Sequence, residues 1–119
     1  MKSELLVYTG FTDGATHHTL NVASIVWVIY EPSGQLLTSG SSCLGPLTNN
    51  IAEYSALIEL LLEAISHGIQ CMVVLLDSQL VVSQLNGSYR VHDSSILRNY
   101  LRVKLLERNF EFITYVHIP

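Results

Sequence analysis

The sequence predicts one α/β domain of 119 residues, a five-stranded mixed sheet flanked by helices in the order β-β-β-α-β-α-α-β. Three observations predict this class. Three segments rich in strand-forming residues come first, separated by short turn sequences, which indicates an antiparallel meander. An amphipathic stretch at 48–67 then has the apolar period of a helix. The wholly apolar segment 71–76 follows it, as is typical of a buried strand in a parallel sheet.

The meander is expected from residues 5–12, 20–30 and 35–43. Asp13-Gly14 follows the first segment, and because Asp-Gly is a common hairpin signal, a tight turn is expected there. The segment 20–30 is almost continuously apolar, which predicts a strand covered on both faces. The segment 35–43 is more polar and is therefore expected near an edge of the sheet.

The stretch 48–67 is expected to form one helix of four to five turns, capped by Asn49 or Asn50. Gly68 can adopt the positive φ that often ends a helix. The predicted buried face carries Leu57, Leu60, Leu61 and Ala64, and the opposite face carries Ala52, Ser55, Glu59, Glu63 and Ser66.

Glu53 falls on the apolar side of this helix, near its start. A buried unpaired charge is costly, so such a residue usually has a partner or a metal ion. The spacing Asn50-x-x-Glu53 is also that of a capping box, and the helix by itself favours this second interpretation.

The second half of the chain is expected to complete the sheet. The strand at 71–76 ends at Asp77-Ser78, and Asp93 is a suitable N-cap for a later helix. Strands joined through helices should pair in parallel by the right-handed crossover rule. The remaining elements are expected as helices at 79–85 and 94–108, the latter with apolar positions Ile96, Tyr100, Leu101, Val103 and Leu105, and a strand at 110–118.

Composition limits the classes of function. The chain is 49% hydrophobic and 13% charged, which argues against disorder, and it has no apolar run long enough for a membrane span or a signal peptide. An intracellular protein, nuclear or cytoplasmic, is expected. Cys43 and Cys71 are expected as two free buried thiols. The adjacent pair His17-His18 indicates a turn at least as well as a metal site.

The net charge of −4 is unfavourable for binding nucleic acid. However, five of the six Lys and Arg residues lie between residues 90 and 108, which is compatible either with an ordinary solvated helix face or with phosphate contacts. These five are Arg90, Arg98, Arg102, Lys104 and Arg108.

Three carboxylates are expected to meet at one place. Asp13 is expected to end the first strand and Asp77 the fourth, and Glu53 points inward from the connecting helix. If these two strands are central neighbours, both Asp side chains emerge at the edge where ligands usually bind to α/β sheets. Three converging carboxylates repel one another unless cations neutralise them, and oxygen ligands suit Mg²⁺ or Mn²⁺.

The segments FTDGAT, TNNIAEYSAL, LLDSQLVVSQL and YVHIP resemble ribonuclease H domains of type I, in the compact form found in plant retroelement-derived and some bacterial proteins. The resemblance extends from Leu5 to Pro119. It implies a ribonuclease H-like fold and a metal-dependent endonuclease that hydrolyses the RNA strand of RNA–DNA hybrids with two Mg²⁺ or Mn²⁺ ions. Integrases and transposases fit less well, because their third carboxylate lies on a late helix.

The resemblance also assigns roles to residues. Asp13 would bridge both metal ions, Glu53 and Asp77 would be the next ligands, and His117 would assist proton transfer or product release. Positions that touch the minor groove of the hybrid, where the 2′-hydroxyl marks RNA, are expected at Gly14, Asn49, Asn50, Ser78 and Gln79.

The sequence departs from the family pattern after His117. The family continues into a further helix with a fourth carboxylate ligand, whereas this sequence stops at Pro119, which is expected to be a boundary within a longer polypeptide. One metal site should then be weakened, and the sheet should expose an apolar face prone to dimerisation, aggregation or domain swapping at the last strand. Segment 85–95 is too short for the basic protrusion of some members, so hybrid binding should be weak and salt-dependent. The alternative function is a catalytically impaired module that binds nucleic acid or tethers a retroelement-derived polyprotein.

Overall fold

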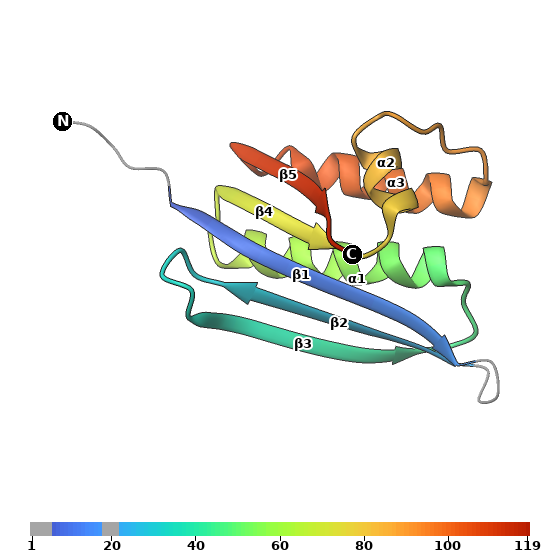
Figure 1. The fold of residues 1–119 in the computed structure, drawn as a ribbon, viewed down its shortest axis with the longest axis horizontal. Coiled ribbons are helices and arrows are strands. Elements are labelled where there is room, and N and C mark those ends of the chain that lie inside the picture. The colour runs from blue at the N-terminus through green and yellow to red at the C-terminus, as the bar shows by residue number, and fades with distance from the viewer. Residues whose placement is uncertain (1–5, 18–21) are drawn as a thin grey trace.

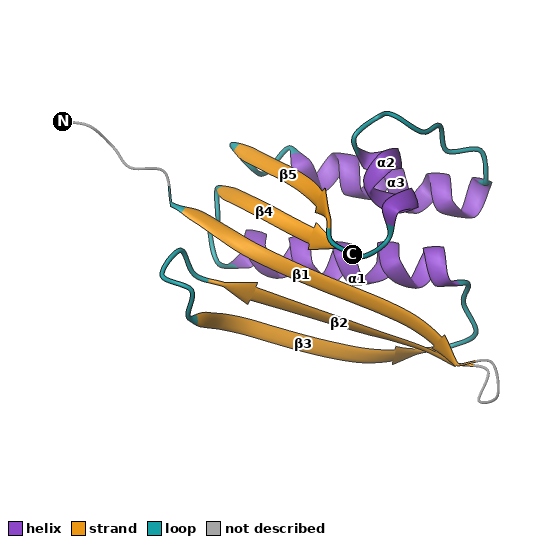
Figure 2. Cartoon of the chain, in the orientation of Figure 1, coloured by secondary structure: helices purple, strands orange, loops and turns teal. Residues whose placement is uncertain are grey.

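The computed structural model describes residues 6–17 and 22–119, and its eight elements follow the predicted order (Figures 1 and 2). The elements are β1 (Val7–His17), β2 (Val22–Tyr30), β3 (Leu36–Leu44), α1 (Asn49–Ser66), β4 (Cys71–Leu76), α2 (Gln79–Leu85), α3 (Ser94–Glu107) and β5 (Phe112–His117).

The sheet has the strand order β3-β2-β1-β4-β5. The meander β1–β2–β3 is antiparallel, and β4 pairs in parallel with both β1 and β5, as predicted. The third strand of the meander lies at an edge, which confirms the expectation from its polar composition. The two strands that carry Asp13 and Asp77 are neighbours near the centre of the sheet.

Strand β1 is longer than predicted, and the predicted turn at Asp13-Gly14 is wrong. Both residues lie inside the strand, where Asp13 pairs with Val26 and Gly14 with Ile25. The strand continues to His17, so this residue belongs to a strand and not to a turn, while His18 and the predicted strand start at residue 20 lie outside the described residues. Pairing with β2 outweighs the local turn preference of Asp-Gly.

The described helices lie on one side of the sheet, behind it in Figure 1. The prediction that the second strand is covered on both faces is therefore wrong, because buried and partly exposed residues alternate along β2. Ile25 and Ile29 face the helices and are buried, whereas Val26 on the other face is 43% exposed. The expected apolar face is thus present, and it also carries exposed Phe112 and Val116 of β5.

The predicted buried face of α1 is confirmed, since Leu57, Leu60, Leu61 and Ala64 are fully buried. Ala52, which was assigned to the outer face, is buried as well because the start of α1 packs closely on β1. The apolar positions Leu101 and Leu105 of α3 are 51% and 60% exposed. The prediction that Cys43 is buried is wrong, because Cys43 lies on the edge strand β3 and is an exposed free thiol, whereas Cys71 is buried and free as predicted.

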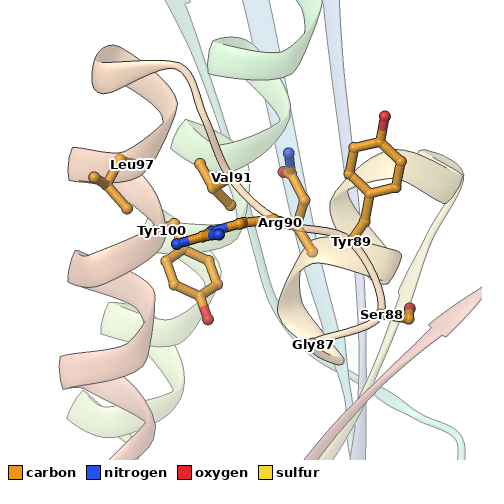
Figure 3. A pocket seen from close by; sticks show the side chains of 8 residues that line it. Gly87, Ser88, Tyr89, Arg90, Val91, Leu97 and Tyr100 are labelled. Carbon is orange, nitrogen blue, oxygen red and sulfur yellow. The ribbon is translucent and has the colours of Figure 1, made fainter.

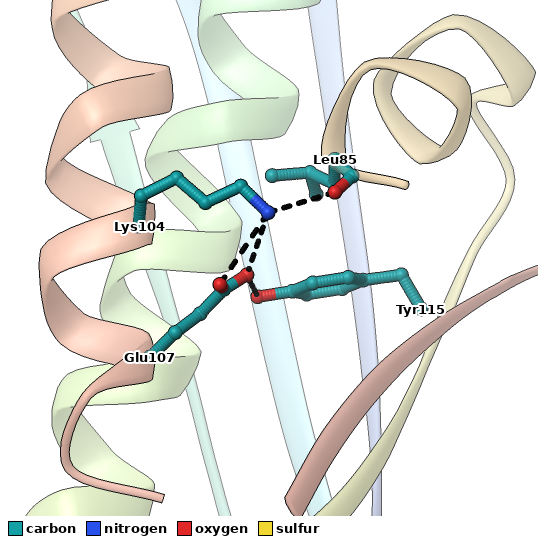
Figure 4. Close-up of polar contacts among 4 residues, drawn as sticks. All are labelled: Leu85, Lys104, Glu107 and Tyr115. Atoms are coloured by element: carbon teal, nitrogen blue, oxygen red, sulfur yellow. Dashed lines mark hydrogen bonds and ion pairs between the residues drawn. The ribbon is translucent and has the colours of Figure 1, made fainter. Parts of the chain in front are cut away.

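A small polar network joins α2, α3 and β5 (Figure 4). Lys104 donates through Nζ to the carbonyl oxygen of Leu85 at 2.8 Å and pairs with Glu107 at 3.4 Å. The hydroxyl of Tyr115 donates to Oε2 of Glu107 at 2.7 Å. Burial and the neighbouring Glu107 carboxylate both raise the pKa of Tyr115, so the phenol stays protonated as this contact requires. Through these contacts the C-terminal end of α2, the helix that begins just after Asp77, is joined to α3 and β5. No helix in the described part of the chain is long and apolar enough to cross a membrane.

Candidate metal centre and nucleic-acid interface

Glu53 reaches the sheet because the start of α1 packs directly on β1 at Gly14. A Cβ atom at Gly14 would lie 2.7 Å from the carbonyl carbon of Ala52 and 2.8 Å from the backbone nitrogen of Glu53. Only glycine permits this approach. The backbone N–H of Gly14 donates a hydrogen bond to the Glu53 carboxylate, which fixes its position beside the strand.

The capping-box interpretation of Glu53 is wrong, and so is the prediction that Asn49 or Asn50 caps the helix. Thr48 is the N-cap, and its hydroxyl accepts a hydrogen bond from the backbone N–H of Ile51 at 3.3 Å. The cap therefore lies one to two residues earlier than predicted, which places Glu53 too far along the helix to reach back to the cap. Thr48 has the extended backbone of an N-cap, and threonine is among the residues preferred at this position.

The three predicted carboxylates converge. One carboxylate oxygen from each of Asp13, Glu53 and Asp77 lies within 4.8 Å of the others. Both Asp side chains are exposed, whereas Glu53 is 7% exposed and its Oε2 atom has no hydrogen-bond partner. The sequence predicted this convergence from chain order and neighbouring strands, although Asp13 lies within β1 and not at its end.

The electrostatics of the cluster centre on Glu53. Burial raises the pKa of Glu53 to about 7, and the charges of Asp77 and then Asp13 act in the same direction against the opposing hydrogen bond from Gly14. A group in this environment is a candidate for a functional role. The unpartnered buried oxygen and the oxygen-only donor set fit a hard divalent cation, which would favour the charged form of all three carboxylates.

A groove surrounds these carboxylates and contains most of the predicted substrate-contacting residues. It is lined by Asp13, Gly14, Thr16, Asn49, Asn50, Glu53, Asp77 and Ser78. Ser78 is also the N-cap of α2. Its hydroxyl oxygen accepts a hydrogen bond from the backbone N–H of Val81 at 3.3 Å. Gln79, the first residue of that helix, is exposed and does not line the groove.

Thr16 is a groove residue that the sequence analysis missed. Its hydroxyl donates to Oδ1 of Asn49 at 2.6 Å, which joins the end of β1 to the first residue of α1. The analysis ended the first strand before Asp13, so Thr16 was not considered. Strand alternation from Gly14 would have placed it on the face toward α1.

His117 lies at the end of β5, next to Asp77 but outside this groove. Its Nε2 atom is 3.2 Å from the backbone carbonyl oxygen of Asp77. Because a carbonyl oxygen only accepts, Nε2 must carry the proton in this contact, and in the neutral ring Nδ1 is then a free acceptor.

A separate pocket lies where the loop after α2 meets the start of α3 (Figure 3). Its lining residues are Gln84, Gly87, Ser88, Tyr89, Arg90, Val91, Leu97 and Tyr100. None of the predicted site residues lies here, and Arg90 is the only cationic residue of the lining.

The fold and the position of the carboxylates define the ribonuclease H-like class of α/β domains. The structure of ribonuclease H1 from the halophilic archaeon Halobacterium salinarum superposes with a TM-score of 0.89 at 32% identity, covering 95% of this chain and 86% of that one. The N-terminal ribonuclease H domain of a Mycobacterium tuberculosis protein gives a TM-score of 0.90 at 30% identity over 96% of this chain and 83% of that one. A third relative, LC11 ribonuclease H1 in complex with an RNA/DNA hybrid, gives 0.86 at 29% identity over 94% and 85%.

The chain belongs to the reverse transcriptase-like family, whose model matches residues 11–119, and it is a ribonuclease H-like domain. It is 33% identical to the ribonuclease HI of H. salinarum over 109 residues, 92% of this chain. It spans 55% of that relative and 26% of a bifunctional protein from M. tuberculosis to which it is also 33% identical.

Proposed function

We propose that this chain hydrolyses the RNA strand of RNA–DNA hybrids with the help of divalent metal ions, Mg²⁺ or Mn²⁺. One observation carries the proposal: three carboxylates lie within 4.8 Å of one another around a buried Glu53 oxygen that has no partner. Like charges this close repel one another, and a bound divalent cation relieves this repulsion while all three carboxylates are ionised. The ribonuclease H1 relatives, one of them solved with a hybrid, supply the substrate class.

In this proposal, Asp13, Glu53 and Asp77 would hold the divalent ions. Bound there, divalent ions supply an activated water and stabilise the charge on the leaving oxygen of the phosphodiester. The amides of Asn49 and Asn50, with the hydroxyl of Ser78, would donate and accept hydrogen bonds along the minor groove and so recognise 2′-hydroxyl groups.

His117 would accept and release a proton beside the reacting phosphate. The Asp77 carbonyl holds its Nε2–H, which leaves Nδ1 available as the proton acceptor. Gly14 would serve the site indirectly, by admitting the start of α1.

The first test is cleavage of a labelled hybrid with Mg²⁺ and with Mn²⁺, comparing the wild type with Asp13→Asn. We expect metal-dependent cleavage of the RNA strand, and a loss of at least about a hundredfold in the variant, because removal of a ligand charge weakens ion binding. Asp93→Asn is the matched control, since Asp93 caps α3 and asparagine caps equally well. Cleavage that survives in Asp13→Asn would contradict the proposal.

A second candidate is a module that binds the hybrid without efficient turnover. In the part of the chain that the structure describes, the acidic group has three members, whereas the resemblance to type I enzymes implies four. A wild type that binds hybrid but does not cut it under either metal would support this candidate.

A further inference from the structure

Thr16 and Asn49 form a direct hydrogen bond in the groove that surrounds the carboxylates. The Thr16 hydroxyl donates to Oδ1 of Asn49 over 2.6 Å, and both residues line this groove together with Asp13 and Glu53. The two residues are 33 positions apart in the chain, one in β1 and the other in α1. The bond therefore joins the two elements that carry Asp13 and Glu53.

The strand places the Thr16 side chain on the side of the sheet that faces α1. Thr16 pairs with Ala23 of β2, which is fully buried, and it lies two residues after Gly14 on the same face of β1. The backbone of Ala52 lies against Gly14, so the start of α1 is directly beside this face of the strand. Because threonine is β-branched, its side chain has few rotamers, and the position of the hydroxyl is set by the strand.

The length of the contact indicates which Asn49 atom faces Thr16. Hydrogen bonds from a hydroxyl to oxygen are commonly about 2.7–2.8 Å long, whereas those from an N–H group to oxygen are about 2.9–3.0 Å. At 2.6 Å the contact is of the first kind, so the amide oxygen points to Thr16 and the NH₂ group points away from it. Asn49 is exposed, and its Nδ2 atom has no hydrogen bond to any other residue that the structure describes.

An amide held in this way presents donors to a ligand. A free asparagine amide can present either its oxygen or its NH₂ group by rotation about its last side-chain bond. Because the oxygen of Asn49 is engaged by Thr16, the ligand must supply an acceptor for the N–H groups. In the minor groove of a hybrid, the 2′-hydroxyl oxygen is an acceptor that a DNA strand lacks.

We propose that Thr16 is a positioning residue that holds the Asn49 amide with its N–H groups toward a 2′-hydroxyl oxygen of the RNA strand. Thr16 thereby contributes to the discrimination between a hybrid and a DNA duplex. This role rests on the proposed function and adds to it a residue that acts only through Asn49. Without the Thr16 hydroxyl, the amide must be ordered when the hybrid binds, which lowers the affinity.

Binding of a labelled hybrid and of a DNA duplex of equal length, measured by fluorescence anisotropy, tests this role. All variants carry Asp13→Asn, so that the hybrid stays intact. Thr16→Val removes the hydroxyl and keeps the shape of the side chain. We expect its affinity for the hybrid to fall by about three- to tenfold, the usual effect of losing one hydrogen bond, and its affinity for DNA to stay unchanged.

Two further variants serve as controls. Thr16→Ser keeps the hydroxyl and should restore the preference of the parent for the hybrid. Thr9→Val makes the same substitution in a partly buried threonine of the same strand that does not line the groove, so it should bind both duplexes like the parent.

A double-mutant cycle tests whether Thr16 acts through Asn49. Asn49→Ala should lower the affinity for the hybrid, and Thr16→Val should have no further effect in that background, whereas the effects of Thr16→Val and Asn50→Ala should add. In the protein with Asp13 intact, Thr16→Val should raise KM by a similar factor and leave kcat unchanged.

The outcomes distinguish this role from the proposed function. If the parent prefers the hybrid and Thr16→Val prefers it equally, the proposed function stands and the role of Thr16 is contradicted. An equal loss of affinity for hybrid and DNA in Thr16→Val would indicate a general structural effect and would also overturn the role. A parent that binds hybrid and DNA alike would contradict both the role of Thr16 and the proposed recognition of RNA.

Discussion

Burial of Glu53 disfavours the ionised form of its carboxyl group, which is the form that would bind a metal ion. Its carboxyl group is buried beside two other carboxylates, and one of its oxygens has no hydrogen-bond partner. Burial raises its pKa to about 7, from an ordinary value of 4.5. The folded protein therefore retains a proton that the unfolded chain has lost between these two pH values.

This residue makes the stability of the metal-free protein depend on pH. As the pH rises from 5 to 8, the folded state must ionise Glu53 at a cost, so the free energy of unfolding in EDTA should fall by up to about 3 kcal/mol through this group. Glu53→Gln cannot ionise and should lack this part of the decrease. Urea unfolding of both proteins at several pH values measures the difference.

Glu63→Gln provides the control for this measurement, because Glu63 lies on the outer face of the same helix. It should follow the wild type. Added Mg²⁺ should reduce the loss of stability at pH 8 in the wild type and in Glu63→Gln but not in Glu53→Gln, since a bound cation favours the ionised carboxylates. Equal pH dependence in wild type and Glu53→Gln would contradict this account.

At the scale of elements, the close contact of α1 with β1 determines the site. The backbone of Ala52 lies where a side chain at Gly14 would be, so the helix start touches the strand without an intervening layer. This contact brings Glu53 beside Asp13 and also buries Ala52.

Gly14→Ala should separate the two elements. Its Cβ would meet backbone atoms, which cannot rotate away, so α1 must shift; we expect a destabilisation of about 1–3 kcal/mol and a loss of hybrid cleavage. Thermal unfolding and the cleavage assay measure the two effects. Gly45→Ala is the matched control, because nothing lies within 4 Å of a Cβ at that position. If Gly14→Ala kept both wild-type stability and cleavage, this close contact would not determine the site.

At the scale of the whole molecule, an acidic chain is proposed to bind a polyanion. The net charge is −4, and five of the six cationic residues lie between residues 90 and 108. Arg90 is exposed in the loop after α2, whereas Arg98 and Arg102 are exposed on α3. The cations are thus divided between two surfaces.

Hybrid binding should therefore be weak and should depend strongly on salt. We expect Asp13→Asn to bind the hybrid without cutting it. Its affinity should fall by about one to two orders of magnitude between 50 and 200 mM salt, because a few phosphate contacts release counterions. Fluorescence anisotropy with a labelled hybrid measures this. A DNA duplex of equal length separates the general charge effect from recognition of RNA, and an affinity that is independent of salt would be inconsistent with phosphate contacts.

The sequence by itself determined the order of the elements and the convergence of the carboxylates. Apolar periodicity and turn residues are local signals, and they correctly predicted the segments of α1, β4 and α2, the cap at Asp93 and the positive φ of Gly68. The meeting of Asp13, Glu53 and Asp77 followed from strand order, because neighbouring strands bring their side chains to one edge.

Only the tertiary structure decided which surfaces are covered. An apolar residue looks the same in the sequence whether a neighbouring element lies over it or not, so the exposure of Val26, Leu101 and Leu105 was not predictable from the pattern. The same reason applies to Asp13-Gly14, where pairing with β2 replaced the expected turn by a continuous strand. The residue types of a segment limit the conformations that it can adopt. Pairing and packing with distant segments then determine which of these conformations it takes in the folded protein.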